Sequence, residues 1–225
     1  MKIDIVTLFP EMFKGPFDYS IMDRAIKNNL AKIEIHDLRK YGIGERRTVD
    51  DRPYSGGVGM ILRVDVVVKA INEIKSKNSK VILLSAGGKK FTQQKASEYS
   101  KLENLILICG HYEGFDERIL EYVDEEITVG DYVLTGGEIP SMVITDAVVR
   151  LIPGAIPKED ATKFESFTKR DLVEYPQYTR PEEFEGLKVP GVLLSGNHSE
   201  IEKWKEIKAI VKTKKNRPDL IKKVE

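Results

Sequence analysis

Glycine and ionisable residues gather in one stretch of the chain, residues 105–156. Residues 105–109 form a continuous apolar run that ends in Gly110 and is followed by the ionisable series HYEGFDER. A second run ends at Gly130 and leads through DYVL into TGGE, residues 135–138. Adjacent glycines permit backbone conformations and close approaches that a Cβ would forbid. The two loops therefore predict a ligand that is held largely by main-chain groups.

Strand and helix patterns alternate around these loops. Strand patterns cover residues 2–9, 33–38, 81–85 and 105–109, and helical spacing covers 11–30, 64–74 and 92–102. The first helical pattern breaks near Gly15 and Pro16, and Thr92 is the expected N-cap of the third. This alternation predicts an α/β domain with a mostly parallel sheet and flanking helices. The polar loops then fall at the carboxyl ends of strands, where ligands bind in such sheets.

The composition is that of a globular chain without a charge bias. The chain has 225 residues, 41% hydrophobic and 32% charged, with 36 basic and 36 acidic side chains. This balance gives no support for nucleic-acid binding, so local patches must provide it. No apolar run reaches membrane-spanning length and the first residues lead directly into a strand, so we expect neither signal peptide nor membrane anchor. The single cysteine excludes an internal disulfide and fits a reducing cytoplasm.

Four ionisable residues have ordinary structural interpretations. Cys109 lies in an apolar run and is expected to be a small core residue. His36 is expected to be a plain strand histidine, because no second ligand stands at metal-site spacing. Asp116 and Arg118 are expected to pair locally at the start of a helix. The sequence therefore predicts no metal site.

The C-terminal part of the chain changes character after residue 158. Residues 159–170 are polar and mixed in charge without an apolar period, which predicts a flexible linker over 158–175. An extended, proline-containing segment follows, and SGNHSEIEKW then opens a helix capped by Asn197 or Ser199. Residues 208–223 carry seven basic side chains and one acidic side chain. Such a tail is usually a solvated face, but it also suits contacts with RNA phosphates.

Several ordered blocks of the sequence resemble one known family. The blocks are GHYEGFDERI, VGDYVLTGGEIPSMVITDAVVRLIPG, YPQYTRPEEFEG and VPGVLLSGNHSEI. They resemble the bacterial tRNA (guanine-N1)-methyltransferases of the SPOUT class, over about residues 1–218. The resemblance implies a trefoil-knotted cofactor site, which no periodicity or composition indicates. It also implies a SPOUT α/β cofactor-binding domain over 1–157, the linker over 158–175, and a small, mainly helical RNA-binding domain over 176–225.

The resemblance implies methyl transfer from S-adenosylmethionine to N1 of guanosine at tRNA position 37. Glu113 is expected to face the positively charged sulfonium; its alternative role is a helix-start carboxylate bound by backbone N–H groups. The sequence AGGK at 86–89 departs from the usual family loop in its first two residues. The positions that correspond to the family's cofactor site are Leu84, Ser85, Gly110, Tyr112, Glu113, Thr128, Val129, Gly130, Tyr132, Leu134, Gly136 and Gly137.

Methylation of guanine N1 requires that the N1 proton leave before or as the methyl group arrives. A carboxylate can accept that proton, and a cation near O6 can stabilise the charge that develops. On the family's pattern the cation is Arg150, and the base stands at Glu165, where relatives carry an aspartate. Glutamate has similar basicity but one more methylene. Asp160 is the alternative base, although it lacks the Ser-Phe neighbours, and we favour Glu165.

The resemblance further implies an anticodon stem-loop substrate, a homodimer with a shared active site, and dependence on Mg²⁺. Two alternatives stay open. The first is a SPOUT methyltransferase for another RNA site or a ribose hydroxyl, against which the blocks YTRPEEFEG and SGNHSEI argue. The second is a catalytically impaired RNA-binding homologue, motivated by Glu165 and by a C-terminal tail shorter than in many relatives. The retained cofactor loops argue against this second alternative.

Overall fold

The protein is described by a computed structural model that covers residues 1–158, 162, 164–168 and 171–221. The chain divides into two compact units, Met1–Lys158 and Glu159–Glu225. Part of the expected linker, together with Asp160, lies outside the described residues.

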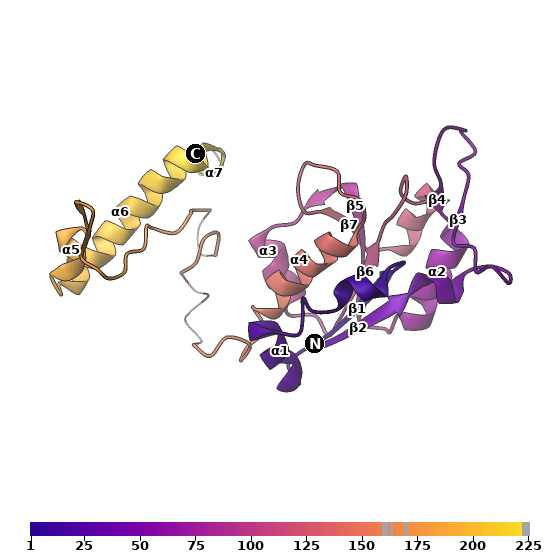
Figure 1. Cartoon of the computed structure of the whole chain (residues 1–225), viewed down its shortest axis with the longest axis horizontal. Helices are drawn as coiled ribbons and strands as arrows, with labels where there is room; N and C mark the ends of the chain where they lie inside the picture. Colours follow the sequence, from indigo (N-terminus) through magenta and orange to yellow (C-terminus); the bar gives the residue numbers. More distant parts are fainter. Residues whose placement is uncertain (159–161, 163, 169–170, 222–225) are drawn as a thin grey trace. The chain divides into compact units, whose positions relative to one another are not determined.

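The first unit is built on a five-stranded sheet in which every neighbouring pair is parallel. Its order is β2-β1-β6-β5-β7, so β6 occupies the centre (Figure 1). All six residues of β6 are buried, as the continuous apolar run predicted. The strands are β1 (Lys2–Thr7), β2 (Lys32–Asp37), β5 (Ser79–Lys90), β6 (Asn104–Cys109) and β7 (Glu125–Thr128).

Helices cover both faces of this sheet, which confirms the predicted α/β class. Along β6, Leu105 and Leu107 belong to the core cluster on one face, whereas Ile106 and Ile108 belong to the cluster on the other. The first cluster is completed by α1 (Ser20–Lys27), α3 (Gln93–Tyr99) and α4 (Glu138–Val149). The second is completed by α2 (Val64–Ile74) and the 3₁₀ helices Leu38–Tyr41 and Glu117–Tyr122. Thr92 caps α3 as expected, because its hydroxyl accepts a hydrogen bond from the Lys95 N–H.

Strand β5 is longer than the predicted strand, which ended at residue 85. It pairs with β7 through Leu84 and Ile127, and again through Lys89 and Ile127, so residues 85–88 bulge out between two registers. Gly88 allows this return, since a Cβ there would lie 2.5 Å from the backbone nitrogen of Ile127. The bulge places the loop AGGK at the edge of the sheet where the ligand was expected.

The glycine-rich stretch 41–60 contains β3 (Asp50–Asp51), which forms a short hairpin with β4 (Ile61–Leu62). The hairpin is fastened to the loop after β6, because Glu113 N–H donates to the Met60 carbonyl at 3.0 Å and Leu62 N–H donates to the Gly114 carbonyl at 2.9 Å. The stretch is therefore joined to the predicted ligand loops.

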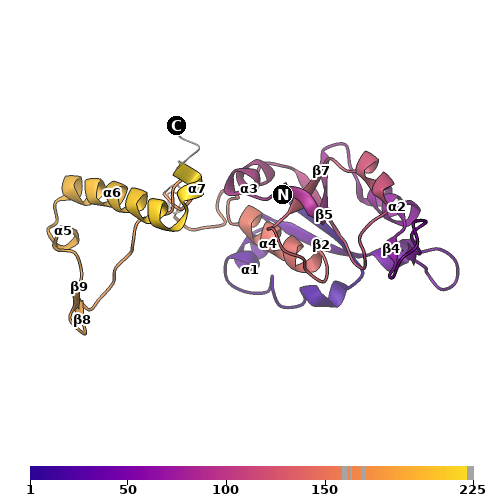
Figure 2. The ribbon, with the colours of Figure 1, turned by 90° about the horizontal axis from the view of Figure 1, so that it is seen from above.

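The second unit contains the long helix α6 (His198–Asn216), which begins at an Asn197 cap as predicted. Figure 2 shows the hairpin of β8 (Glu183–Phe184) and β9 (Leu187–Lys188), followed by α5 (Gly191–Leu194), α6 and α7 (Pro218–Ile221). Thr213 of α6 accepts a hydrogen bond from the Val173 N–H at 2.9 Å, which attaches the preceding extended segment to the helix. Over the part of the chain that is described, no helix is long and apolar enough to cross a membrane.

Candidate functional site

A pocket of about 400 Å³ lies at the carboxyl ends of β6 and β7 and at the bulge of β5, the strand between them. This is the edge at which parallel sheets bind ligands. Of the predicted cofactor residues, all but Gly130 line it. The lining members of that set are Leu84, Ser85, Gly110, Tyr112, Glu113, Thr128, Val129, Tyr132, Leu134, Gly136 and Gly137. Gly130 is buried next to the pocket, where its N–H and carbonyl both bond to the Thr128 hydroxyl.

Two glycines allow the main chains around the pocket to meet. Gly137 donates its N–H to the carbonyl of Gly110 at 2.8 Å. A Cβ on Gly137 would lie 2.6 Å from the Cα of Cys109, and one on Gly110 would lie 2.7 Å from the ring of Phe115. The start of α4 therefore lies directly on the end of β6, an approach that only residues without a Cβ permit.

The loop after β6 has an unusual backbone. Tyr112 adopts a φ of 61°, in the left-handed region that non-glycine side chains rarely occupy. The next residue, Glu113, projects toward Gly59, where an added Cβ would lie 2.5 Å from the Glu113 Cγ. Gly59 itself has a φ of 110°. The glycine-rich stretch before β4 thus forms part of the surroundings of the predicted sulfonium-facing carboxylate.

A buried polar network that the sequence did not predict lies behind the pocket. Glu138, whose side chain is 1% exposed, accepts a hydrogen bond from the Thr7 hydroxyl at 2.5 Å. Its other oxygen lies 2.8 Å from Nε2 of His111, which lines the pocket. Thr7 and Glu138 are separated by 131 residues, so no local spacing could reveal the contact. The available sequence signal was a glutamate directly after two glycines, which resembled an ordinary first-turn carboxylate.

Carboxylates contribute most of the formal charge on the pocket lining. Glu113, Glu117 and Glu126 line the pocket. Among the described residues, no lysine or arginine lines it. Carboxylates near a bound cation are favourable in proportion to their proximity and burial. The pocket is therefore suited to a ligand with a positive centre.

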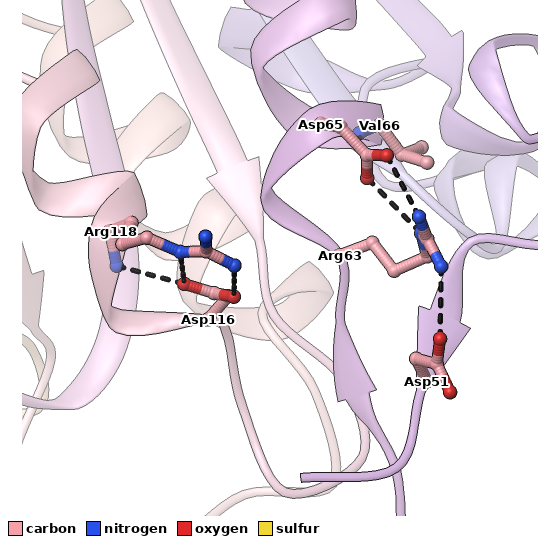
Figure 3. A network of polar contacts seen from close by, with 6 residues as sticks. All are labelled: Asp51, Arg63, Asp65, Val66, Asp116 and Arg118. Carbon is pink, nitrogen blue, oxygen red and sulfur yellow. Dashed lines mark hydrogen bonds and ion pairs between the residues drawn. The ribbon is translucent and has the colours of Figure 1, made fainter. Parts of the chain in front are cut away.

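Figure 3 shows two local ion-pair groups near this region. Arg118 binds Asp116 through two hydrogen bonds, of 2.9 and 2.6 Å, and this pairing lowers the pKa of the Asp116 carboxyl. Arg63 bridges Asp51 on β3 and Asp65 on α2, each at 2.9 Å from a guanidinium nitrogen (Figure 3). The expectation that Asp116 and Arg118 pair locally is confirmed. Cys109 is also the buried core residue that was expected, and burial, with the charge of Glu138, raises the pKa of its thiol.

His36 differs from its expectation, because the fold brings two possible metal ligands to it. Parallel pairing of β1 and β2 aligns Asp4 with Glu34, and ligand atoms of Asp4, Glu34 and His36 lie within 4.8 Å of one another. This group could not be predicted from sequence spacing, because Asp4 lies on β1 whereas Glu34 and His36 lie on β2. The Lys2 ammonium bridges the carboxylates, at 2.9 Å from Asp4 and 2.8 Å from Glu34. The group is therefore charge-compensated from within the chain, and we assign no metal to it.

The two predicted catalytic residues lie in different units. Arg150 is the C-cap residue of α4 in the first unit, and its N–H donates to the Asp146 carbonyl at 3.1 Å. Glu165 belongs to the second unit, where its carbonyl accepts from the Thr168 hydroxyl at 2.9 Å. The Glu165 side chain lines a second pocket, of about 780 Å³, formed with residues 172–175 and α6.

A parallel α/β domain with a ligand pocket at its strand ends, closed by glycine loops, is the architecture of a nucleotide-cofactor-binding enzyme. Comparison with known proteins identifies one family over nearly the whole chain. The model of the family described as tRNA (Guanine-1)-methyltransferase TrmD matches residues 1–223. The chain belongs to this tRNA (guanine-1)-methyltransferase family.

Curated relatives agree with the family assignment. A protein of Dictyoglomus turgidum named tRNA (guanine-N(1)-)-methyltransferase is 53% identical over 223 residues, which cover 99% of this chain and 91% of the relative. A protein of the same name from Clostridium beijerinckii is 51% identical over 225 residues, covering 100% of this chain and 93% of the relative. Another, from Staphylococcus aureus, is 50% identical, with 99% and 91% covered.

Proposed function

We propose that the protein transfers a methyl group from S-adenosylmethionine to N1 of guanosine at position 37 of tRNA. The observation that supports this most directly is the match of the family over residues 1–223, together with a pocket at the sheet edge lined by the expected loops. Two relatives with 53% and 51% sequence identity are named tRNA (guanine-N(1)-)-methyltransferase. The protein is accordingly a methyltransferase.

The volume and the charge of the pocket support S-adenosylmethionine as its ligand. Its volume of about 400 Å³ lies in the range of small-molecule sites, and glycines at 110, 136 and 137 line it. When bound, the cofactor supplies an electrophilic methyl group on a positively charged sulfonium. Glu113 lines the pocket and is proposed to face that charge, with Glu117 and Glu126 adding to the negative field. The trefoil knot of the SPOUT class remains part of the proposal.

Two side chains are proposed to act on guanine. Glu165 accepts the N1 proton, and Arg150 stabilises the negative charge that develops toward O6. Neither Glu165 nor Arg150 lines the strand-edge pocket. In the reaction, the guanine must therefore lie between these two side chains and the methyl donor in the pocket. The expectation that residues 159–170 become ordered over bound RNA, so that the base assembles only on the correct substrate, stays a proposal, since residues 159–161, 163, 169 and 170 lie outside the described residues.

The geometry of α4 supports a shared active site. The helix begins at the pocket with Glu138 and ends at Val149, with Arg150 as its C-cap. Pro140 is the last α4 residue that lines the pocket, and a rise of about 1.5 Å per residue places Arg150 about 15 Å further along the helix, beyond the reach of one side chain. A twofold-related copy could present its own Arg150 to this pocket. We therefore include a homodimer in the proposal.

The proposed partner is the anticodon stem-loop of tRNA, and the proposed location is the cytoplasm. Exposed Lys208, Lys214 and Lys215 on α6 supply positive charge for phosphate contacts. Mg²⁺ is implied by the family resemblance. The one group of three possible ligands within the described ranges includes a histidine and is bridged by Lys2, so it does not suit an ion that prefers octahedral oxygen ligands. The proposal therefore contains no Mg²⁺ site and no step through the ion.

The test is methylation of tRNA transcripts with labelled S-adenosylmethionine, followed by identification of the product nucleoside. We expect 1-methylguanosine from transcripts with guanosine at position 37 and no product when that position carries adenosine. A methylated ribose, or a product at another position, would establish the first alternative. Cofactor and tRNA binding without any methyl transfer would establish the impaired RNA-binding homologue.

A further inference from the structure

Glu138 is a buried carboxylate with both oxygens engaged. Oε1 accepts from the Thr7 hydroxyl at 2.5 Å, and Oε2 lies 2.8 Å from His111 Nε2. The Thr7 oxygen in turn accepts from the Phe9 N–H at 2.9 Å. Burial of a carboxylate is costly unless it is paired and hydrogen-bonded. The network therefore joins the end of β1, the first turn of α4 and the loop after β6 in one fixed arrangement.

His111 transmits this arrangement to the pocket. Of the described pair, only His111 lines the pocket, and its ring is held between Glu138 and Phe9, 4.7 Å from the Phe9 centroid. The next residue is Tyr112, with the left-handed φ of 61°. A non-glycine residue keeps such a conformation only where its surroundings determine it. The fixed imidazole stands directly before this residue, and the Glu113 N–H bond to the Met60 carbonyl stands directly after it.

Gly136 connects the second pocket loop to the same pair. A Cβ at this position would lie 2.2 Å from His111 Nε2 and 2.5 Å from Glu138 Oε2. The glycine therefore leaves the space that the carboxylate–imidazole contact occupies. This one contact therefore joins His111 of the first loop to the space at Gly136 in the second, which a carboxylate with only a helix-capping role would not do.

We propose that Glu138 is a positioning residue for the cofactor pocket: its carboxylate holds His111, and through it residues 110–114, in the conformation that receives S-adenosylmethionine. This inference rests on the proposed function for the identity of the ligand. Glu138 acts through His111 and does not touch the cofactor. Its contribution belongs to cofactor binding rather than to the chemical step.

The test compares Glu138→Gln with a matched control, Asp4→Asn. Asp4, on β1, is also a fully buried carboxylate that pairs with a histidine, at 2.6 Å from His36 Nε2, but His36, unlike His111, does not line the pocket. We expect Glu138→Gln to raise both the Kd and the KM for S-adenosylmethionine about tenfold, with kcat at saturating cofactor within twofold of wild type. Asp4→Asn should lose stability and leave the Kd unchanged. Equal Kd shifts in the two folded variants would overturn the proposal.

A second readout needs no ligand. Amide hydrogen exchange across residues 110–114 should accelerate about tenfold in Glu138→Gln and stay at the wild-type rate in Asp4→Asn. If Glu138→Gln does not fold, Thr7→Val removes one donor to the carboxylate and should shift the Kd in the same direction, with Thr7→Ser restoring it. Wild-type Kd and unchanged exchange in the folded variants would refute the positioning role. Failure of wild-type protein to bind S-adenosylmethionine would instead refute the proposed function, and the exchange result would still decide this inference.

Discussion

The N–H of Gly137 donates to the carbonyl oxygen of Gly110 across 2.8 Å, at the point where α4 begins and β6 has just ended. The two backbones are so close that a Cβ on Gly137 would lie 2.8 Å from the Gly110 nitrogen. Backbone atoms at the end of a buried central strand cannot move aside without disturbing the sheet. This contact therefore sets the distance between the two pocket loops.

Gly137→Ala should destabilise the protein, whereas Gly130→Ala should not. The new methyl group at residue 137 would collide with backbone, and overpacking of this kind costs about 1–3 kcal/mol of unfolding free energy. At residue 130 the nearest atoms belong to the ring of Tyr132, which is 57% exposed and can rotate away. That variant should stay within about 0.5 kcal/mol of wild type. Urea unfolding of both variants checks the order, and equal losses would contradict it.

The sequence predicted those parts of the fold that depend on local periodicity. The apolar run that became β6 and the amphipathic run that became α2 were located within a residue or two. The pocket loops were predicted from adjacent glycines such as those in TGGE. The structure gives the reason for one of them, because a Cβ at Gly137 would collide with β6. Apolar patterns and glycine requirements are properties of a segment and its immediate neighbours, so they can be read from the chain alone.

Contacts between distant segments were not predictable in this way. The Thr7–Glu138 bond and the approach of Asp4 to His36 arise from strand order and register, which periodicity does not specify. The bulge in β5 was missed because both of its registers pair with the same short strand, β7. The roles of Arg150 and Glu165 stay predictions, since they depend on the substrate and on a second copy of the chain.

The Lys2–Glu34 contact gives a prediction for acid stability. Hydrogen bonds from Lys2 and Lys32 lower the pKa of Glu34 from 4.5 to about 2. Because the folded pKa lies below the unfolded one, the carboxylate stabilises the fold above pH 4.5, and this contribution is lost as pH falls from 4.5 to about 2. The side chain is 33% exposed, so solvent screening limits the effect to about 1 kcal/mol.

Glu34→Gln should therefore be less stable than wild type by up to about 1 kcal/mol near neutral pH. The difference in unfolding free energy should shrink as pH falls below 4.5 and approach zero near pH 2. Urea unfolding at a series of pH values measures it. A difference that stays constant over this range would show that Glu34 contributes through packing rather than through its charge.

Mixed dimers test whether the active site is shared. Gly136→Val should weaken cofactor binding while the fold survives, because its side chain would meet the ends of His111 and Glu138 rather than backbone. Arg150→Ala should bind cofactor but methylate poorly.

If α4 of one chain contributes its Arg150 to the pocket of the other, a mixture of the two inactive variants contains heterodimers with one intact site each. Activity should then return to about a quarter of wild type. Calorimetric titration checks the first variant alone, and a mixture without recovered activity would place Arg150 in its own chain's site.

Substitution of Glu165 tests the assignment of the general base. Glu165→Gln keeps the size and hydrogen-bonding capacity of the side chain but removes the proton acceptor. A positioned base contributes about 10²–10⁴ in rate, so single-turnover methylation should fall by that order while the Kd for S-adenosylmethionine holds. Glu165→Asp should retain more activity than Glu165→Gln, since it keeps the carboxylate and loses only reach.

Arg150→Lys and Asp160→Asn complete this series in the same single-turnover assay. Arg150→Lys should methylate slowly, because an ammonium cannot reproduce the planar guanidinium fork. Asp160→Asn is the control for a neighbouring carboxylate and should methylate at nearly the wild-type rate. Wild-type methylation by Glu165→Gln combined with a large loss in Asp160→Asn would transfer the role of base to Asp160. A loss in Glu165→Gln that is matched by weaker tRNA binding, with an unchanged rate at saturating tRNA, would instead make Glu165 a substrate contact.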